Sequence, residues 1–311
     1  MEIGIIGRSE ITYDSMLLMK KNGFTISFIV TSKESKEHKY TSNDFEKYAK
    51  ENDIPFLHEP KINSNKIKLL LGPKKTPKVC ISVNYSGVIP EEVVELFEYG
   101  ILNAHGGDLP KYRGNACQAW AIINNEKKIG LCVHKMIGGE LDSGTIMDRK
   151  YFNLNLDTRI GEVYKWVNRS VPSMMLKVIN ALSNNKDYIL EHQSKNPKKA
   201  LRTYPRLPSD AKINWSNNRK DIIRLINASS EPFGGAFTFL DDKKIIIWRA
   251  KLFDDNENYL AIPGQVLNIN LSNKNIIVAA ADGKIEISNI QYNDLRCSPA
   301  EIIKSIRKRL K

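Results

Sequence analysis

The sequence predicts an α/β protein: a Rossmann-like, mostly parallel sheet with helices on both faces, followed by a small, OB-like β-barrel. Three observations predict it. In the first half of the 311 residues, short apolar segments alternate with segments of helical periodicity, as in βαβ units. Between residues 183 and 208 the composition changes to Asn, Lys, Ser and Pro, which is typical of a linker. Beyond it, short β-branched segments are separated by turn signals, as in a small barrel.

The elements of the first half follow from this alternation. Gly23 ends the first helix, and Ser42 is a good N-cap for the second. Pro172 lacks a backbone N–H, so we expect it to interrupt the last helix. The expected strands are Glu2–Ile6, Thr25–Thr31, Ile54–Leu57, Val79–Val83, Ile101–Ala104 and Ile129–Met136. The expected helices are Thr12–Lys21, Ser42–Lys50, Pro90–Glu98, Ala116–Asn124 and Arg159–Leu182.

The second half predicts a barrel preceded by one helix. Asp241-Asp242 and Asp282-Gly283 are turn signals that separate neighbouring strands. The helix is expected at Arg219–Asn227, and the strands at Phe237–Leu240, Lys243–Leu252, Gly264–Ile269, Asn275–Ala281 and Lys284–Ile290. We therefore predict a first domain over residues 1–185, a linker over 186–208 and a barrel-like domain over 209–311.

Composition indicates a folded, soluble protein. Apolar residues make up 41% and charged residues 26% of the chain. The longest apolar run, residues 276–281, is far shorter than the ~20 residues that cross a bilayer, and the acid at Glu2 does not suit a signal peptide. The cysteines are scattered, without zinc-ligand spacing: Cys80, Cys117, Cys132 and Cys297. We expect a reducing cytoplasm, no membrane partner and no metal.

The net charge of +12 leaves two interpretations open. Residues 1–195 carry 27 basic and 23 acidic side chains, whereas residues 196–311 carry 20 and 12. The second part therefore holds most of the excess, mainly in residues 198–212 and 304–311. Such an excess either binds an anion or forms a solvated basic face.

A glycine pair after the first strand does not predict a dinucleotide site. Gly4-x-x-Gly7 lacks the full G-x-G-x-x-G pattern, and the second strand runs into Ser32-Lys33 without the acid that would hold a ribose. The glycines are better explained by a tight strand-to-helix turn.

The candidate site lies where the fifth predicted strand ends. Asn103 and His105 are two residues apart, so their side chains share one face of an extended segment just before Gly106-Gly107. An amide donor and an imidazole at the end of such a strand can stabilise an oxyanion and move a proton. Asp142, in a Leu-Asp-Ser-Gly turn, can orient the imidazole or raise its pKa. His134 lies in an apolar strand, and we expect a structural role for it.

Several motifs in order resemble the formyltransferase family that uses 10-formyltetrahydrofolate. They are Asn103-x-His105, Leu109–Gly114, Trp120–Ile122, Gly130–His134 and Asp142–Ile146. The resemblance implies that Asn103 binds the formyl oxygen. It also implies that His105 accepts the proton of the attacking ammonium, or shares the oxyanion when protonated, and that Asp142 tunes His105. For the 10-formyltetrahydrofolate cofactor it implies contacts with Ser86, Gly87, Val88, Ile89, Met136, Gly139 and Leu141.

The acceptor of the formyl group is less constrained. The segment Thr31–Tyr48 has four Lys and four acids and no Pro, Gly or Arg, whereas the methionyl-tRNA branch carries a basic loop there. Asp108 adds negative charge where a cationic amine would bind. These features favour the branch that formylates nucleotide-linked amino sugars for surface polysaccharides such as lipopolysaccharide O-antigen.

Two alternatives stay open. The second domain and its charge suit a methionyl-tRNA formyltransferase. The third hypothesis is a non-catalytic basic binding module that kept the fold. As partners we expect a nucleotide-sugar substrate and no nucleic acid, and leave a homodimer open.

Overall fold

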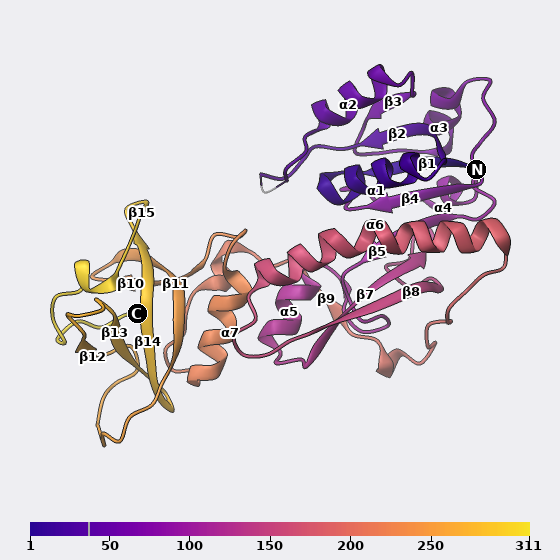
Figure 1. The fold of residues 1–311 in the computed structure, drawn as a ribbon. Coiled ribbons are helices and arrows are strands. Elements are labelled where there is room, and N and C mark those ends of the chain that lie inside the picture. The colour runs from indigo at the N-terminus through magenta and orange to yellow at the C-terminus, as the bar shows by residue number, and fades with distance from the viewer. Residues whose placement is uncertain (37) are drawn as a thin grey trace. The chain divides into compact units, whose positions relative to one another are not determined.

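The computed structural model describes residues 1–36 and 38–311, which form two compact units (Figure 1). The first unit comprises Met1–Cys117, Ile129–Phe152 and Tyr164–Thr203, and the second comprises Gln118–Lys128, Asn153–Val163 and Tyr204–Lys311. Each unit is therefore assembled from three segments of the chain. Glu37, one of the acids counted in the segment Thr31–Tyr48, lies outside the described residues.

A seven-stranded sheet forms the centre of the first unit, in the order β3-β2-β1-β4-β5-β7-β8. Strands β1 to β5 of this sheet pair in parallel, and β7 pairs antiparallel to β5. Their bounds are β1 Glu2–Gly7, β2 Thr25–Thr31, β3 Phe56–His58, β4 Val79–Val83, β5 Ile101–His105, β7 Lys128–Lys135 and β8 Ile146–Asn153. The predicted mostly parallel sheet is confirmed.

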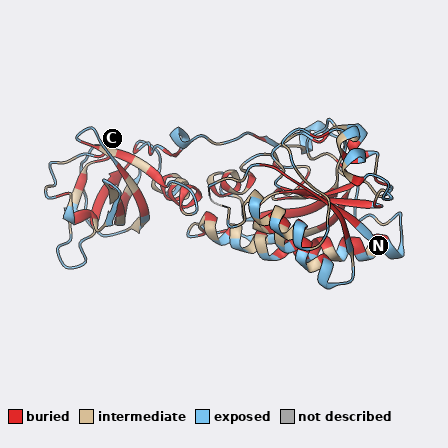
Figure 2. Ribbon diagram, turned by 90° about the horizontal axis from the view of Figure 1, so that it is seen from above, coloured by how far each residue is buried: buried red, intermediate tan, exposed pale blue. Residues whose placement is uncertain are grey.

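The strands of this sheet are buried between helices (Figure 2), because they are apolar on both sides. Ile6, Phe28 and Val30 face α3 and α4 in one core cluster. Strand alternation turns Ile3 and Ile5 to the opposite face, where α1 contacts β1, β2 and β4. The helices of the first unit are α1 Ser9–Lys21, α2 Ser42–Glu51, α3 Ser64–Leu71, α4 Glu91–Val94 and most of α6 Ile160–Asn184. Helix α5, Cys117–Ile123, belongs to the second unit except for its first residue.

The first unit differs from the sequence-based expectation in several places: α3 and β8 were not predicted, and the helix expected over Pro90–Glu98 is confined to α4. Helix α6 runs on without a break at Pro172, so the predicted interruption is wrong. Val171, Met174 and Met175 are buried around the proline, and this packing holds the helix together where propensity alone would not. The segment expected as a linker contains the 3₁₀-helix η1 (Pro197–Lys199) and β9 (Arg202–Thr203), which pairs with β6 (Arg113–Gly114).

The second unit is an antiparallel sheet in the order β10-β11-β14-β13-β12, with β15 paired to β14. Alternating apolar residues of its strands form one core with α7. This core includes Ile222 and Ile226 of α7, and Trp215, which precedes the helix. The bounds are η2 Pro208–Ala211, α7 Arg219–Ser229, β10 Ala236–Leu240, β11 Lys243–Phe253, β12 Val266–Ile269, β13 Ile276–Ala280, β14 Gly283–Tyr292, β15 Leu295–Cys297 and η3 Pro299–Glu301. An α/β unit followed by an antiparallel one confirms the predicted fold class.

The last residues of the chain close this sheet into a barrel. Lys311 and Phe239 of β10 exchange backbone hydrogen bonds of 2.9 and 2.8 Å. On the other edge, the Leu310 N–H donates to Gly264 O at 2.8 Å, and the Val266 N–H of β12 donates to Lys308 O at 3.1 Å. The side chain of Leu310 is buried in the core. The segment 304–311 was expected to form a solvated basic face or to bind an anion. Its last four residues instead have a structural role, because they join the two edges of the sheet.

Within the described residues no helix has the length and apolar character needed to span a bilayer.

Candidate active site

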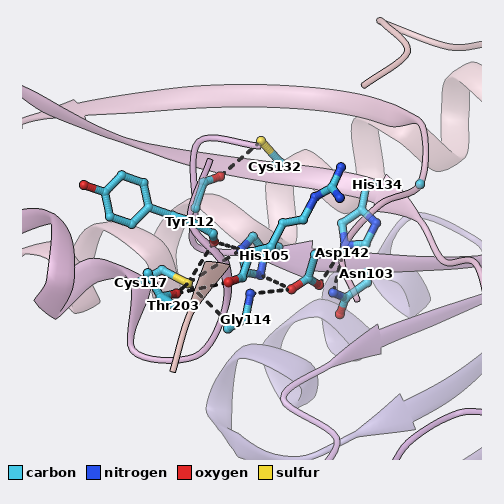
Figure 3. Close-up of polar contacts among 12 residues, drawn as sticks. Asn103, His105, Tyr112, Gly114, Cys117, Cys132, His134, Asp142 and Thr203 are labelled. Carbon is cyan, nitrogen blue, oxygen red and sulfur yellow. Dashed lines mark hydrogen bonds and ion pairs between the residues drawn. The ribbon is translucent and has the colours of Figure 1, made fainter. Parts of the chain in front are cut away.

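The predicted residues Asn103, His105 and Asp142 lie together in the first unit, and His134 joins them (Figure 3). Asn103 and His105 are on β5, and the antiparallel register places His134 of β7 directly opposite Asn103. Asp142 is on the loop that follows β7 and has a left-handed backbone conformation, with φ of 49°. The turn thus directs its carboxylate back toward both histidines.

His134 orients the amide of Asn103. The Nδ1 atom of His134 is 2.9 Å from the Lys135 carbonyl, and because a carbonyl can only accept, Nδ1 carries the proton. In the neutral ring its Nε2 atom then accepts from the Asn103 Nδ2 atom at 3.1 Å. This bond uses one amide N–H of Asn103 and leaves its second N–H for a ligand oxygen. His134 was expected to be structural; the strand register that places it opposite Asn103 is the signal that reveals its contact with the site.

A backbone carbonyl fixes the proton on one nitrogen of His105. The Nε2 atom lies 2.6 Å from the Tyr112 carbonyl, so it must be a donor. Gly107 permits this arrangement, because a Cβ there would lie 2.6 Å from the same nitrogen. The Gly106-Gly107 step therefore serves a close approach within the chain itself. The other nitrogen, Nδ1, is directed toward Asp142 and is the one that can exchange a proton.

Asp142 binds both histidines and one backbone amide. Its Oδ2 atom is 3.4 Å from His105 Nδ1 and accepts from the Gly114 N–H at 2.9 Å, while Oδ1 is 3.5 Å from His134 Nε2. Burial alone would raise the pKa of this carboxyl, but the His134 ring when its Nε2 atom is protonated, the charge of His105 and the Gly114 N–H lower the pKa to about 2. Asp142 is therefore an anion across the physiological pH range.

The same charge acts on His105. Burial lowers the pKa of this imidazole, but the interactions with Cys117 and the Asp142 carboxylate outweigh burial, so the pKa is raised above its usual range. An imidazole with one fixed N–H and one exchangeable nitrogen beside a carboxylate can serve as acid and base. Together with the free N–H of Asn103, the cluster can bind a developing oxyanion and move a proton.

Cys117 and Thr203 support the loop behind His105, and sequence reasoning missed both. The Cys117 Sγ atom lies 3.0 Å from the Tyr112 carbonyl, 3.7 Å from His105 Nε2 and 3.3 Å from Thr203 Oγ1. Thr203 Oγ1 also donates to the Arg113 carbonyl at 3.1 Å. Cys117 was considered only for metals and disulfides, and Thr203 lay in the expected linker.

The charge of Asp108 is already paired. Its carboxylate forms an ion pair with Arg149, which also pairs with Glu191 and donates to the Leu109 carbonyl at 2.9 Å. The sequence-based argument that Asp108 attracts a cationic amine is therefore weakened, because its carboxylate is engaged by Arg149, although Arg149 is shared with Glu191 and the three groups together carry one negative charge.

The residues expected to bind the cofactor lie on two loops, one after β4 and one after β7. Val88 and Leu141 expose 81% and 43% of their surface, although both are apolar. Ile89 and Met136 instead pack in the same core cluster, and thus support the loops from within. The Ser86 N–H donates to Ser32 Oγ at 3.4 Å, the Gly87 backbone lies against Pro60, and Gly139 has open space at its Cβ position.

Two family profiles match this sequence. The formyl transferase family matches residues 11–179, more than half of the 311 residues. The C-terminal domain of formyl transferases matches residues 207–307.

Individual relatives carry different names. The chain is 27% identical to the bifunctional polymyxin resistance protein ArnA of Wigglesworthia glossinidia brevipalpis, a match that covers 94% of this chain and only 43% of ArnA. It is 26% identical to the methionyl-tRNA formyltransferase of Acetivibrio thermocellus, covering 95% and 93% of the two chains.

Solved structures share the fold. WlaRD, a sugar 3N-formyl transferase in the presence of dTDP and 5-N-formyl-THF, has a TM-score of 0.64 at 20% identity, covering 95% and 98% of the two chains. HypX of Aquifex aeolicus in complex with tetrahydrofolic acid has a TM-score of 0.64 at 15% identity, and this chain spans 47% of its length.

Proposed function

The chain belongs to the formyl transferase family, and on that premise we propose that it moves a formyl group from 10-formyltetrahydrofolate to the amino group of a nucleotide-linked amino sugar. The observation that carries the proposal is the cluster of Asn103, His105 and Asp142, in which the unused N–H of Asn103 and the exchangeable nitrogen of His105 lie on one strand. The product would serve surface polysaccharide synthesis, such as that of lipopolysaccharide O-antigen, in the cytoplasm.

The residues divide the work of the transfer. The acceptor nitrogen bonds to the formyl carbon while the bond between that carbon and the folate nitrogen breaks. Asn103 donates its free N–H to the formyl oxygen, on which negative charge develops. His105 Nδ1 takes the proton that the amine loses, and the Asp142 carboxylate stabilises the imidazolium so formed. The same proton can then pass to the departing folate nitrogen, so no net proton remains on the protein.

The loops after β4 and β7 have the chemical character that a folate site requires. A pterin ring offers two apolar faces and a hydrogen-bonding edge, and exposed apolar side chains with nearby backbone groups suit such a ligand. Val88 and Leu141 supply the exposed apolar surface, and the open position at Gly139 allows close approach to the backbone. When bound, 10-formyltetrahydrofolate supplies the activated formyl group.

Paired charges in the second unit favour a small acceptor over a nucleic acid. Lys284 pairs with Asp255 and Glu257, and Lys308 pairs with Asp241. Glu231 alone engages three arginines: Arg159, Arg249 and Arg296. Lys284 and Lys308 are neutralised by these carboxylates and are therefore less available to phosphates, whereas the single carboxylate of Glu231 cannot neutralise three arginines. The likeness to WlaRD supports the same choice of acceptor.

The alternative acceptor is methionyl-tRNA. The observation that favours it is the match to a methionyl-tRNA formyltransferase over 93% of that protein's length, including the second unit.

One experiment separates the two acceptors. The protein is incubated with 10-formyltetrahydrofolate and either a panel of nucleotide-linked amino sugars or charged initiator tRNA, and mass spectrometry detects the formamide. We expect turnover of an amino sugar, a KM that changes little between 50 and 200 mM salt, and no competition from excess tRNA. An enzyme that binds tRNA through about six to ten phosphate contacts would lose a factor of about 10³–10⁵ in affinity over that range of salt concentration. Formylated tRNA with such a loss would establish the alternative, and formyl-folate binding without any turnover would identify a non-catalytic module.

A further inference from the structure

The segment between residues 191 and 203, here called the strap, connects the two loops that meet at His105. At one end, Glu191 exchanges backbone hydrogen bonds of 2.9 and 3.1 Å with Ile146 at the start of β8. At the other end, Leu201 accepts from the Arg113 N–H at 2.9 Å, and β9 pairs with β6. The strap therefore runs from the loop that carries Asp142 to the loop that carries Tyr112 and Gly114.

Gln193 is the side chain of the strap that binds both loops at once. Its Nε2 atom donates to the Asp142 carbonyl and to the Gly144 carbonyl, both at 2.8 Å. Its Oε1 atom accepts from Arg113 Nη2 at 2.7 Å. Three of the four hydrogen-bonding positions of the amide are thus used, with two bonds to the loop of the catalytic carboxylate and one to the segment that donates the Gly114 N–H to Asp142 Oδ2.

The loop of Asp142 needs such support. Asp142 holds a left-handed φ of 49°, which an aspartate adopts only at some cost. Gly144 packs so closely on the Lys135 carbonyl that a Cβ could not fit. The carboxylate reaches His105 Nδ1 at 3.4 Å, a separation that a small shift of the loop would lengthen beyond a useful contact. The two carbonyls that accept hydrogen bonds from Gln193, those of Asp142 and Gly144, belong to this turn.

We propose that Gln193 is a positioning residue, which locks the Asp142 loop to the Arg113–Gly114 segment and so holds the Asp142 carboxylate against His105. For its effect on turnover this inference rests on the proposed formyl transfer, but the placement of Asp142 does not. Gln193 is about 50 residues from Asp142 in a polar stretch with no motif, which is why sequence reasoning passed over it.

The test replaces Gln193→Met, which keeps the length of the side chain and removes all three hydrogen bonds without adding charge. Ser194→Ala, at the next residue of the strap, is the matched control. The pKa of His105 is measured by NMR titration of its imidazole in the substrate-free protein. Cys117 and His134 also face this ring, so Asp142→Asn is the reference for complete loss of the carboxylate. We expect the pKa to fall toward the ordinary value in Gln193→Met and Asp142→Asn, and to stay unchanged in Ser194→Ala.

Kinetics give the second readout. A misplaced catalytic group costs up to about 100-fold in rate, so we expect kcat of Gln193→Met to fall by about ten- to 100-fold while KM changes little. In the Asp142→Asn background the same substitution should cost almost nothing more, because the group that it positions is gone. Gln193→Asn, which retracts the amide by one methylene, should shift both readouts in the same direction with less risk to folding.

Two results would overturn the inference: an unchanged His105 pKa in folded Gln193→Met and Gln193→Asn, or losses that add fully in the double variant. Because the titration needs no substrate, a wild-type protein without formyl transfer but with the expected pKa changes would refute only the proposed function.

Discussion

Each unit of the chain holds a carboxylate whose pKa is about 2, and the two carboxylates are held in different ways. In the first unit, burial would raise the pKa of Asp142, and two histidines and a backbone N–H lower it instead. In the second unit, burial likewise opposes the shift at Glu231, and its own backbone N–H with Arg296, Arg159 and Arg249 produces it. The shifts are alike, but the partners are not.

The partners decide what each carboxylate can do. Arginine keeps its proton at every pH that a protein survives, so the contacts of Glu231 can only hold structure. Histidine gains and loses a proton near neutral pH, so the contacts of Asp142 respond to proton transfer. A lowered carboxyl pKa therefore does not by itself identify a reacting centre. A carboxylate whose partners titrate in the working range is the better indicator.

The largest expected effect is on the chemistry of the first unit. Asn103→Ala and His105→Ala should each lower kcat by about 10²–10³, because each removes an oxyanion donor or the proton-transfer group. Asn103→Ala should leave the Tm nearly unchanged. His105 is buried, so His105→Ala should also lower the Tm, and the Asn103 variant is the cleaner kinetic test. Activity within tenfold of wild type in either variant would contradict the assignment of the site.

The barrel of the second unit should respond in stability and not in chemistry. Leu310 is 2% exposed on the segment that closes the barrel, and a buried Leu→Ala change costs about 2–5 kcal/mol. We expect Leu310→Ala to lower the unfolding free energy of this unit by about that amount, measured by denaturant titration, with kcat kept at temperatures where the protein is folded. Arg309→Ala, an exposed neighbour, should have little effect on stability. Equal stabilities of the two variants would show that the segment does not close the barrel.

Glu231→Gln removes the carboxylate that holds the three arginines, and it tests whether this carboxylate, unlike Asp142, has only a structural role. The side chain is 37% exposed, so solvent screens its ion pairs and the loss should be about 1–2 kcal/mol. The pKa of Glu231 is lowered from 4.5 to about 2, so its contribution to stability is present above pH 4.5 and is lost as the pH falls toward 2. Glu231→Gln should remove that pH dependence while kcat stays as in wild type. A loss of kcat in the folded variant would break the contrast between the units.

The sequence predicted those parts of the site that depend on local pattern. The apolar strand before Asn103 and His105, and the turn at Asp142, are local signals, and the structure brings all three side chains together. Most strands of both units were likewise visible as β-branched segments between turn signals, but β8 and β15 were not predicted. Local patterning therefore gave the fold class and the polar side chains at the strand end.

Supports that come from distant segments could not be predicted in this way. Gln193 and Thr203 lie in a polar stretch whose composition is that of a linker, and only their tertiary hydrogen bonds reveal a role. His134 faces Asn103 only because β7 runs antiparallel to β5, and no local signal sets that register. Pro172 shows the converse, because burial on both sides of the residue overrides its helix-breaking tendency.

The smallest expected effect concerns pH and tests whether Asp142 acts through a titrating partner. His105 must be neutral at Nδ1 to take a proton, so kcat/KM should fall on the acid side with the pKa of this group. The Asp142 carboxylate stabilises the imidazolium and helps to raise that pKa. Asp142→Asn removes the charge, so the acid limb should move to lower pH while the plateau rate also falls. Asp108→Asn is a suitable control, because Asp108 pairs with Arg149 and not with His105. If the acid limb keeps its position in Asp142→Asn, the two groups are not coupled, and Asp142 would be a structural anion of the same kind as Glu231.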